Sequence, residues 1–376
     1  MKSIRMVDLQ SQYLKLKKEI DDAMQEVILS SAFINGPSVK KFAENLADYA
    51  GTAHVVPCGN GTDALQVSLM ALDLKPGDEV IVPDFTFIAT VEVVAFMGLT
   101  PVVTDVDPDT FMMRPDEIEK AVTSRTRAII PVHLYGQCAP MEDILTIAKK
   151  HNLFVIEDSA QALGSDYLFS DGTRKKAGTL GHTGCISFFP SKSLGAYGDG
   201  GAIFTNDAVL AVKLRSIVNH GTRKKYFHER VGINSRLDTL QAAILDVKLQ
   251  HLDEFNLARQ QAADFYNHAF MSLPYLKIPK QVPWSTHIFH QYTLITRGIN
   301  RDELIKYLKD KGIPAMIYYP QPMHRQKAFA HFSFAGQDFP VSDMLCKSVL
   351  SLPMHPELTE DQLHWITKHI SEYPKR

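Results

Sequence analysis

The chain has 376 residues, which is enough for two closely packed lobes rather than one core. A formal charge of -2 excludes the electrostatic footprint of a nucleic-acid or anionic-membrane binder, and 45% hydrophobic residues are ordinary for a globular protein. The N-terminus lacks the apolar stretch of a signal peptide and no run approaches 18 apolar residues, so we expect a cytoplasmic protein. None of the four cysteines forms a CxxC pair, so we expect buried thiols and no metal site.

Short apolar runs alternate with helix-period segments between about residues 40 and 205. This alternation predicts an α/β fold with repeated strand–helix–strand units around a mainly parallel sheet. In such sheets, ligands bind at the carboxyl ends of the strands. The expected strands span residues 53–57, 79–82, 100–106, 127–132, 153–157, 185–189 and 201–205, and the expected helices span 63–72, 88–97, 115–121 and 141–150.

The pattern changes after residue 205. A polar, basic stretch covers 218–230, and apolar residues at near-helical spacing from 237 to 252 predict one long helix. We expect this helix to connect a large domain, 1–250, to a smaller C-terminal α+β domain, 251–376. In the smaller domain the expected elements are a strand at 291–296 and helices at 301–311 and 361–371.

The segment Cys58-Gly-Asn-Gly-Thr62-Asp63 follows an expected strand and opens an expected helix. Glycines permit a tight turn there, and the first N–H groups of the helix and its dipole favour an anion. The segment is neither a Walker loop nor GxGxxG. It is a phosphate cup or a plain glycine turn with a Thr/Asp cap, and both interpretations stay open.

Two carboxylates end the apolar run in Leu153-Phe-Val-Ile-Glu157-Asp158-Ser-Ala-Gln161. Asp158 could cap the next helix. Alternatively, it could pair with the pyridine nitrogen of pyridoxal phosphate (PLP) and keep the ring an electron sink. Gln161 would then hydrogen-bond the ring hydroxyl or Asp158.

A lysine leaves a strand into a glycine-dense turn in Ser187-Phe-Phe-Pro-Ser-Lys192-Ser-Leu-Gly195. The plain interpretation is an exposed lysine on a surface turn. The functional one is a lysine that forms a Schiff base and shuttles a proton, with a pKa lowered by desolvation. Further on, Asn234 and Arg236 precede the long helix, and taken alone they are best explained as caps.

Taken together, Gly-Asn-Gly-Thr62, Glu157–Gln161, Ser187–Lys192 and Gly-Ile-Asn234-Ser-Arg236-Leu-Asp resemble the DegT/DnrJ/EryC1/StrS family. These are nucleotide-sugar aminotransferases of the aspartate aminotransferase fold, fold type I. The resemblance runs from Phe33-Ile-Asn-Gly-Pro37 to Ser351-Leu-Pro-Met-His-Pro356, nearly the whole chain.

The resemblance implies a role for each motif. Lys192 would bind PLP covalently and act as acid and base, Asp158 would pair with the ring nitrogen, and Gln161 would lie near the ring hydroxyl. Phe87 would stack on the ring. Asn234 would reach the phosphate of the neighbouring subunit's cofactor, which implies a homodimer with shared active sites. The cofactor's own phosphate would be held by Gly61, Thr62, Asp63 and Ser187.

The resemblance also implies a substrate. The motifs look most like the branch that aminates UDP-2-acetamido-2-deoxy-3-oxo-glucuronate for bacterial surface polysaccharides such as lipopolysaccharide, typically with glutamate as amino donor. Candidate sugar-site residues are Arg236 from the partner chain, Tyr318, Tyr319 and His324.

Lys192 also bears on the alternatives, because family members that act as dehydratases carry histidine in its place. A PLP-dependent sugar dehydratase and a non-catalytic regulator of the same family remain the rival interpretations. A nucleotide-hydrolysing protein is the weakest rival, since the Walker lysine is missing.

Overall fold

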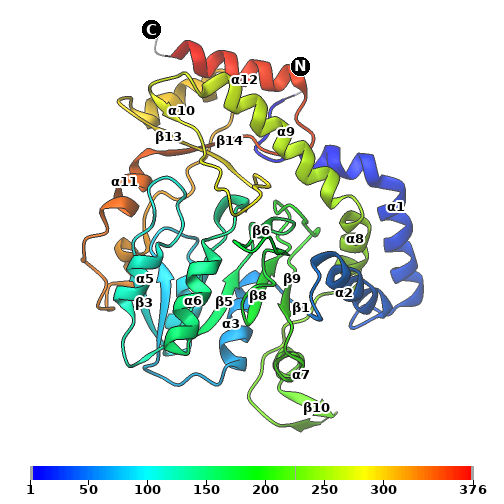
Figure 1. The fold of residues 1–376 in the computed structure, drawn as a ribbon. Coiled ribbons are helices and arrows are strands. Elements are labelled where there is room, and N and C mark those ends of the chain that lie inside the picture. The colour runs from blue at the N-terminus through cyan, green and yellow to red at the C-terminus, as the bar shows by residue number, and fades with distance from the viewer. Residues whose placement is uncertain (1–2, 225, 374–376) are drawn as a thin grey trace.

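A computed structural model describes residues 3–224 and 226–373. Its centre is a seven-stranded sheet in the order β1-β9-β8-β5-β4-β2-β3 (Figure 1). Neighbouring strands are parallel except at β9, which runs antiparallel to β1 and β8. The predicted α/β class and mainly parallel sheet are therefore confirmed. The strands are β1 (His54–Cys58), β2 (Glu79–Pro83), β3 (Thr100–Thr104), β4 (Thr126–Ile129), β5 (Phe154–Asp158), β8 (Thr183–Ser187) and β9 (Gly201–Thr205).

Helices cover both faces of this sheet (Figure 1). Because side chains alternate along a strand, Val80 and Val82 point into one apolar core and Ile81 into another. The first core is closed by α3 (Gly61–Ala71), α4 (Ala89–Phe96) and α7 (Ala208–Ile217). The opposite face is covered by α2 (Pro37–Ala50), α5 (Pro115–Ala121), α6 (Met141–His151) and α8 (Thr239–Leu249).

The C-terminal part has its own apolar core around a three-stranded antiparallel sheet. Ile4 also packs into this core, so the first residues of the chain lie with the C-terminal part. The division between 1–250 and 251–376 remains a proposal. The elements here are α9 (Leu252–Phe270), β12 (Leu276–Lys277), β13 (Tyr292–Thr296), α10 (Arg301–Asp310), α11 (Pro340–Ser348), β14 (Val349–Leu352) and α12 (Glu360–Glu372).

A helix does form within the predicted range 237–252, but it ends at Leu249, so the prediction of one unbroken helix is wrong. The chain forms α8 and α9, which are separated at Gln250 and His251. α8 packs against α1 (Leu9–Ser30) and α2, whereas α9 packs against α12 in the C-terminal core. Each helix buries a face against a different partner, so buried residues occur on both sides of the break. The apolar pattern in the sequence therefore does not reveal where α8 ends and α9 begins.

Two short hairpins were not predicted from the sequence. The basic stretch 218–230 contains β10 (Thr222–Lys224) and β11 (Phe227–His228), and a second hairpin pairs β6 (Asp166–Leu168) with β7 (Arg174–Lys176). All four cysteines are free and buried, as expected. Among the described residues, no helix combines the length and apolar character that crossing a bilayer requires.

We expect Gly184→Ala to destabilise the protein by about 1–3 kcal/mol, because a Cβ at this position in β8 would lie 2.0 Å from the carbonyl oxygen of Gly178, which is backbone. Gly198→Ala is the matched control, since the nearest atom would be the end of the Gln241 side chain at 3.3 Å. The thermal unfolding midpoints of the two variants test this prediction. An equal decrease in the midpoint for both variants would contradict it.

Candidate active site

A cavity of about 760 Å³ opens at the carboxyl ends of strands β1, β2, β5 and β8. This is the edge at which parallel sheets bind ligands. The sequence-predicted residues that line it are Gly61, Thr62, Asp63, Phe87, Asp158, Gln161, Ser187, Lys192, Tyr318 and Tyr319.

One end of the cavity is formed by the beginning of α3, directly after β1. The side chain of Asn60 caps this helix by accepting the N–H of Asp63 at 2.7 Å, so the cap is Asn60 rather than the Thr/Asp pair. The N–H groups of Gly61 and Thr62 have no acceptor within the helix. A Cβ on Gly61 would lie 2.7 Å from Cβ of Ser187, so only glycine allows this approach. The arrangement leaves free donors and a helix dipole that suit a phosphate group.

Asp158 is the last residue of β5 and is buried, with 7% of its surface exposed. Its Oδ2 accepts a hydrogen bond from Thr90 Oγ1 at 2.8 Å, and its Oδ1 accepts one from the N–H of Ala160 at 3.3 Å. No helix begins directly after Asp158, so it is not an N-cap. Burial raises the pKa of the Asp158 carboxyl, and no ion pair in the described part of the chain includes it. A ligand with a cationic N–H would satisfy this carboxylate.

Lys192 lies in the turn after β8, where its N–H donates to the carbonyl oxygen of Phe189 at 2.8 Å. Its side chain enters the same cavity as Asp158. Burial lowers the pKa of the Lys192 amine to about 8, against the attraction of Asp158, which raises it. A large fraction of this amine is therefore neutral near pH 8 and able to attack an aldehyde.

Aromatic and amide groups form the remaining wall. Gln161 accepts the N–H of Tyr135 at 2.7 Å and donates to the Tyr319 hydroxyl at 3.0 Å, which fixes the orientation of its amide. The Tyr135 hydroxyl donates to the carbonyl oxygen of Tyr318. Phe87 is 53% exposed and its ring centre lies 6.1 Å from that of Tyr319. Flat apolar surface is thus available on one side of the cavity.

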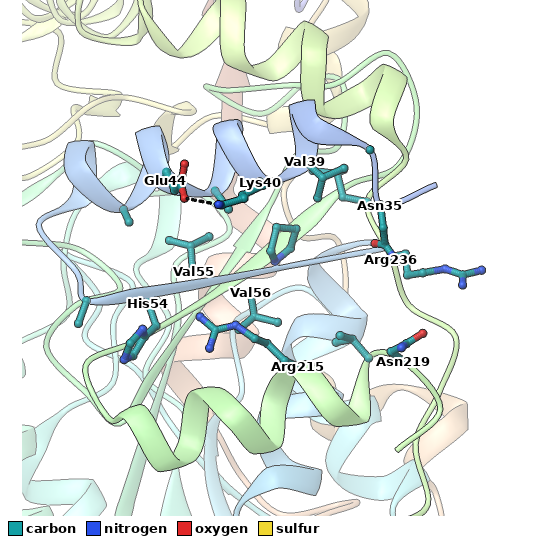
Figure 2. A pocket seen from close by; sticks show the side chains of 17 residues that line it. Asn35, Val39, Lys40, Glu44, His54, Val55, Val56, Arg215, Asn219 and Arg236 are labelled. Carbon is teal, nitrogen blue, oxygen red and sulfur yellow. Dashed lines mark ion pairs between the residues drawn. The ribbon is translucent and has the colours of Figure 1, made fainter. Parts of the chain in front are cut away.

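Asn234 and Arg236 do not line this cavity. They precede α8, which begins at Thr239 with Asp238 as its N-cap, so the interpretation of these residues as caps is wrong. Arg236 lines a second cavity of about 530 Å³ between α2, β1 and α7, and in Figure 2 its guanidinium extends away from β1. Between the two residues, Ser235 accepts the N–H of Gly59 at 2.8 Å and donates to Asp63 at 2.6 Å.

His324, expected at the sugar site, does not reach the cavity either. Its side chain is buried, and Nδ1 lies 2.7 Å from Oδ2 of Asp84. The backbone N–H of His324 donates to the other oxygen of Asp84 at 2.8 Å. Its two hydrogen bonds hold the segment after Tyr319 against the end of β2. The proposed substrate site therefore does not include His324.

Several residues that line the cavity were not predicted from the sequence: Thr86, Tyr135, Asp199, His290 and Gln291. His290 is buried and burial lowers its pKa well below the ordinary value, so it is neutral. Its Nδ1 has no hydrogen-bond partner in the described part of the chain. A lone histidine before a strand carries no motif, so the sequence offered no signal for it. Thr86 precedes Phe87, which is one of the predicted cofactor-binding residues.

The cavity contains the three groups that PLP requires. It has free helical N–H groups for a phosphate at Gly61 and Thr62, a buried carboxylate for a ring N–H⁺ at Asp158, and an amine for an aldehyde at Lys192. The residues present therefore fit this cofactor.

Comparison with known proteins supports the same assignment. The sequence pattern of the DegT/DnrJ/EryC1/StrS aminotransferase family matches residues 14–371. The "Pleiotropic regulatory protein" of Geobacillus stearothermophilus is 47% identical over 99% of this chain and 98% of its own length. The UDP-2-acetamido-2-deoxy-3-oxo-D-glucuronate aminotransferase of Pseudomonas aeruginosa is 44% identical over 94% of this chain and 96% of its own.

Solved structures agree. DesV of S. venezuelae, crystallised with a ketimine intermediate, is 38% identical with a TM-score of 0.95, covering 100% of both chains. NtdA of Bacillus subtilis, solved with its cofactor PMP bound, is 30% identical with a TM-score of 0.91, covering 100% of this chain and 86% of its own. The chain therefore belongs to the DegT/DnrJ/EryC1/StrS aminotransferase family, it is a nucleotide-sugar transaminase, and its cofactor is pyridoxal phosphate.

Proposed function

We propose that this transaminase moves the amino group of glutamate to a UDP-linked 3-keto uronic acid, for the synthesis of bacterial surface polysaccharides such as lipopolysaccharide. The proposal of transamination depends on one observation: Lys192 and the buried Asp158 line the same cavity. The sugar is proposed from the Pseudomonas relative, whose substrate bears a 3-oxo group on a glucuronate. Sugar choice rests on few pocket residues, so the sugar is the part most in need of a test.

Each residue that lines the cavity has a separate proposed role toward the cofactor. Lys192 would bind the cofactor, and its Nζ would move a proton between the cofactor and the substrate carbon: away from the α-carbon of the donor in the first half of the reaction, and onto the sugar carbon that receives the amine in the second. Asp158 would face the ring nitrogen and keep it protonated. The N–H groups of Gly61 and Thr62 and the hydroxyl of Ser187 would hold the phosphate, whereas the N–H of Asp63, expected there too, is already accepted by Asn60. When bound, PLP supplies an aldehyde that accepts the amino group and a ring that withdraws electrons from the carbon losing its proton.

The substrate side of the site is proposed to include a second subunit. Asn234 is exposed and Arg236 is half-buried, and neither lines the cavity of its own chain that holds Lys192, so both side chains are available to a partner's site. Arg236 would pair with the uronate or the diphosphate. Tyr318 and Tyr319 line the wall beside Gln161 and would contact the sugar or nucleotide. The working unit is thus a homodimer.

A regulatory role is the second candidate, because one relative is called a pleiotropic regulatory protein. Against a role without catalysis stands the set of Lys192, Asp158 and Gln161, all facing one cavity. A purified protein that stays colourless after PLP is added would favour the regulator.

The substrate is tested with purified protein, PLP, glutamate and a panel of UDP- and dTDP-linked keto sugars. Mass spectrometry should show that the UDP-linked 3-keto uronic acid gains an amine. Lys192→Ala should abolish this product, since no other lysine among the described residues lines the cavity. Loss of water without gain of nitrogen would instead identify a dehydratase, and amination of a dTDP sugar alone would overturn the proposed substrate.

The rate at which cofactor-free protein captures PLP should depend on pH. Only the neutral amine attacks an aldehyde, and the pKa of Lys192 is lowered to about 8. The rate constant should therefore rise about tenfold per pH unit well below pH 8 and level off above it. Stopped-flow absorbance measures this, with Lys192→Ala as the control. If the rate constant still increased at about pH 10, the pKa of Lys192 would be that of an unperturbed lysine.

Asn234→Ala should weaken cofactor retention if this residue reaches the partner's phosphate. A lost hydrogen bond to a charged group should raise the dissociation constant about tenfold or more. Equilibrium dialysis against PLP measures this constant, and the control is Asn219→Ala, which changes the residue paired with Asn234 in an antiparallel bridge. If sedimentation showed a monomer and that monomer were fully active, the shared site would be contradicted.

A further inference from the structure

Two buried threonines form a line of hydrogen bonds that ends on Asp158. Thr90 Oγ1 lies 2.8 Å from Oδ2 of Asp158, and Thr86 Oγ1 lies 3.0 Å from Thr90 Oγ1. Thr90 is fully buried and Thr86 is 1% exposed, so water does not substitute for either contact. Thr90 belongs to the first turn of α4, and Thr86 lies in the loop that leads into it.

The protonation state of Asp158 fixes the direction of these bonds. An ionised carboxylate only accepts hydrogen bonds, so the single hydroxyl hydrogen of Thr90 points at Oδ2. The oxygen of Thr90 then accepts, which makes Thr86 the donor of the second bond. Protonation of Asp158 on Oδ2 would turn both hydroxyls around and leave the hydrogen of Thr86 in need of another acceptor. The line of hydroxyls therefore favours the ionised carboxylate.

Burial and this hydrogen bond act in opposite directions on Asp158. Burial raises the pKa of the carboxyl, while the hydrogen bond from Thr90 lowers it. The one other direct hydrogen bond in the described chain, from the N–H of Ala160, is longer at 3.3 Å and reaches the other oxygen. Thr90 is thus the nearer of the two protein donors that oppose the cost of burying the charge.

The same contacts fix the position of Phe87. This residue lies between Thr86 and Thr90 in sequence, and its carbonyl oxygen accepts the N–H of Thr90 at 3.3 Å. Phe87 faces the cavity from this short segment. The hydroxyl line consequently joins the segment that carries Phe87 to the end of β5 that carries Asp158.

We propose that Thr90, oriented by Thr86, is a positioning residue that keeps Asp158 ionised and fixed toward the ring nitrogen of the cofactor. This inference rests on the proposed role of Asp158. Removal of the Thr90 hydroxyl makes the carboxylate more basic, so the proton moves from the ring nitrogen toward Asp158. The ring then withdraws fewer electrons, and the nitrogen that links Lys192 to the cofactor becomes more basic.

The test uses the holoenzyme and five variants, of which Asp158→Asn is described last. Thr90→Val keeps the shape and removes the hydroxyl, Thr90→Ser keeps the hydroxyl, and Thr86→Val removes the second donor. Thr183→Val is the matched control, because this threonine is also fully buried in the sheet but its hydroxyl has no partner in the described chain. The readouts are the pH midpoint of the visible absorbance change of the bound cofactor, its dissociation constant, and kcat separately from KM.

Thr90→Val should raise the pH midpoint, weaken cofactor binding about tenfold or more, and lower kcat more than it raises KM. Thr90→Ser should restore the midpoint. Thr86→Val should shift it in the same direction by less, which gives a second measurement if Thr90→Val fails to fold. Thr183→Val should leave all three readouts unchanged.

The variant Asp158→Asn distinguishes failure of this inference from failure of the proposed function. If Asp158→Asn raises the midpoint while Thr90→Val and Thr86→Val do not, the hydroxyl line has no such role and the proposed function stands. If Asp158→Asn also leaves the midpoint and cofactor affinity unchanged, the role of Asp158 in the proposed function fails, and the inference fails with it.

Discussion

Two ionisable side chains share one cavity, and the pKa of each is shifted by burial toward the value that favours its neutral form. The pKa of Lys192 falls to about 8 and that of Asp158 rises, while their mutual attraction opposes both shifts. A buried carboxylate is costly unless hydrogen bonds or a cation compensate it. The fold brings this pair together because β5 and β8 are adjacent and parallel, with Asp158 opposite Cys185 two residues before the end of β8. Their carboxyl ends therefore open into the same space.

The residue before Asp158 shows how the end of β5 is held. Glu157 points to the opposite face of the strand and is fully buried. Its carboxylate accepts backbone N–H groups of Gly178, Leu180 and Gly181 and pairs with Nε2 of His133 at 2.8 Å. Nδ1 of His133 accepts the N–H of Ala139, which makes Nε2 the donor. Glu157 is thus saturated and structural, whereas its neighbour retains accepting capacity inside the cavity.

The sequence was most informative where burial or chemistry left a pattern. Central strands buried on both faces appear as apolar runs, so β2, β5 and β9 were predicted to within a residue or two. The glycines around Lys192 and the strand before Asp158 indicated the cofactor. A site residue that belongs to no sequence motif could not be predicted. His290 is one example, because it is a lone histidine before a strand. The break between α8 and α9 was hidden, because apolar spacing does not record which partner a face is buried against.

The contact between Gly61 and Ser187 has a consequence for redesign. A side chain at position 61 would have to displace the end of a central strand, so this end of the cavity has no freedom to change size. Tyr318 and Tyr319, by contrast, come from the segment between α10 and α11 and make no part of the sheet. Engineered variants that accept bulkier sugars are therefore to be sought among changes at the tyrosine wall, with the glycine-bearing turn left as it is.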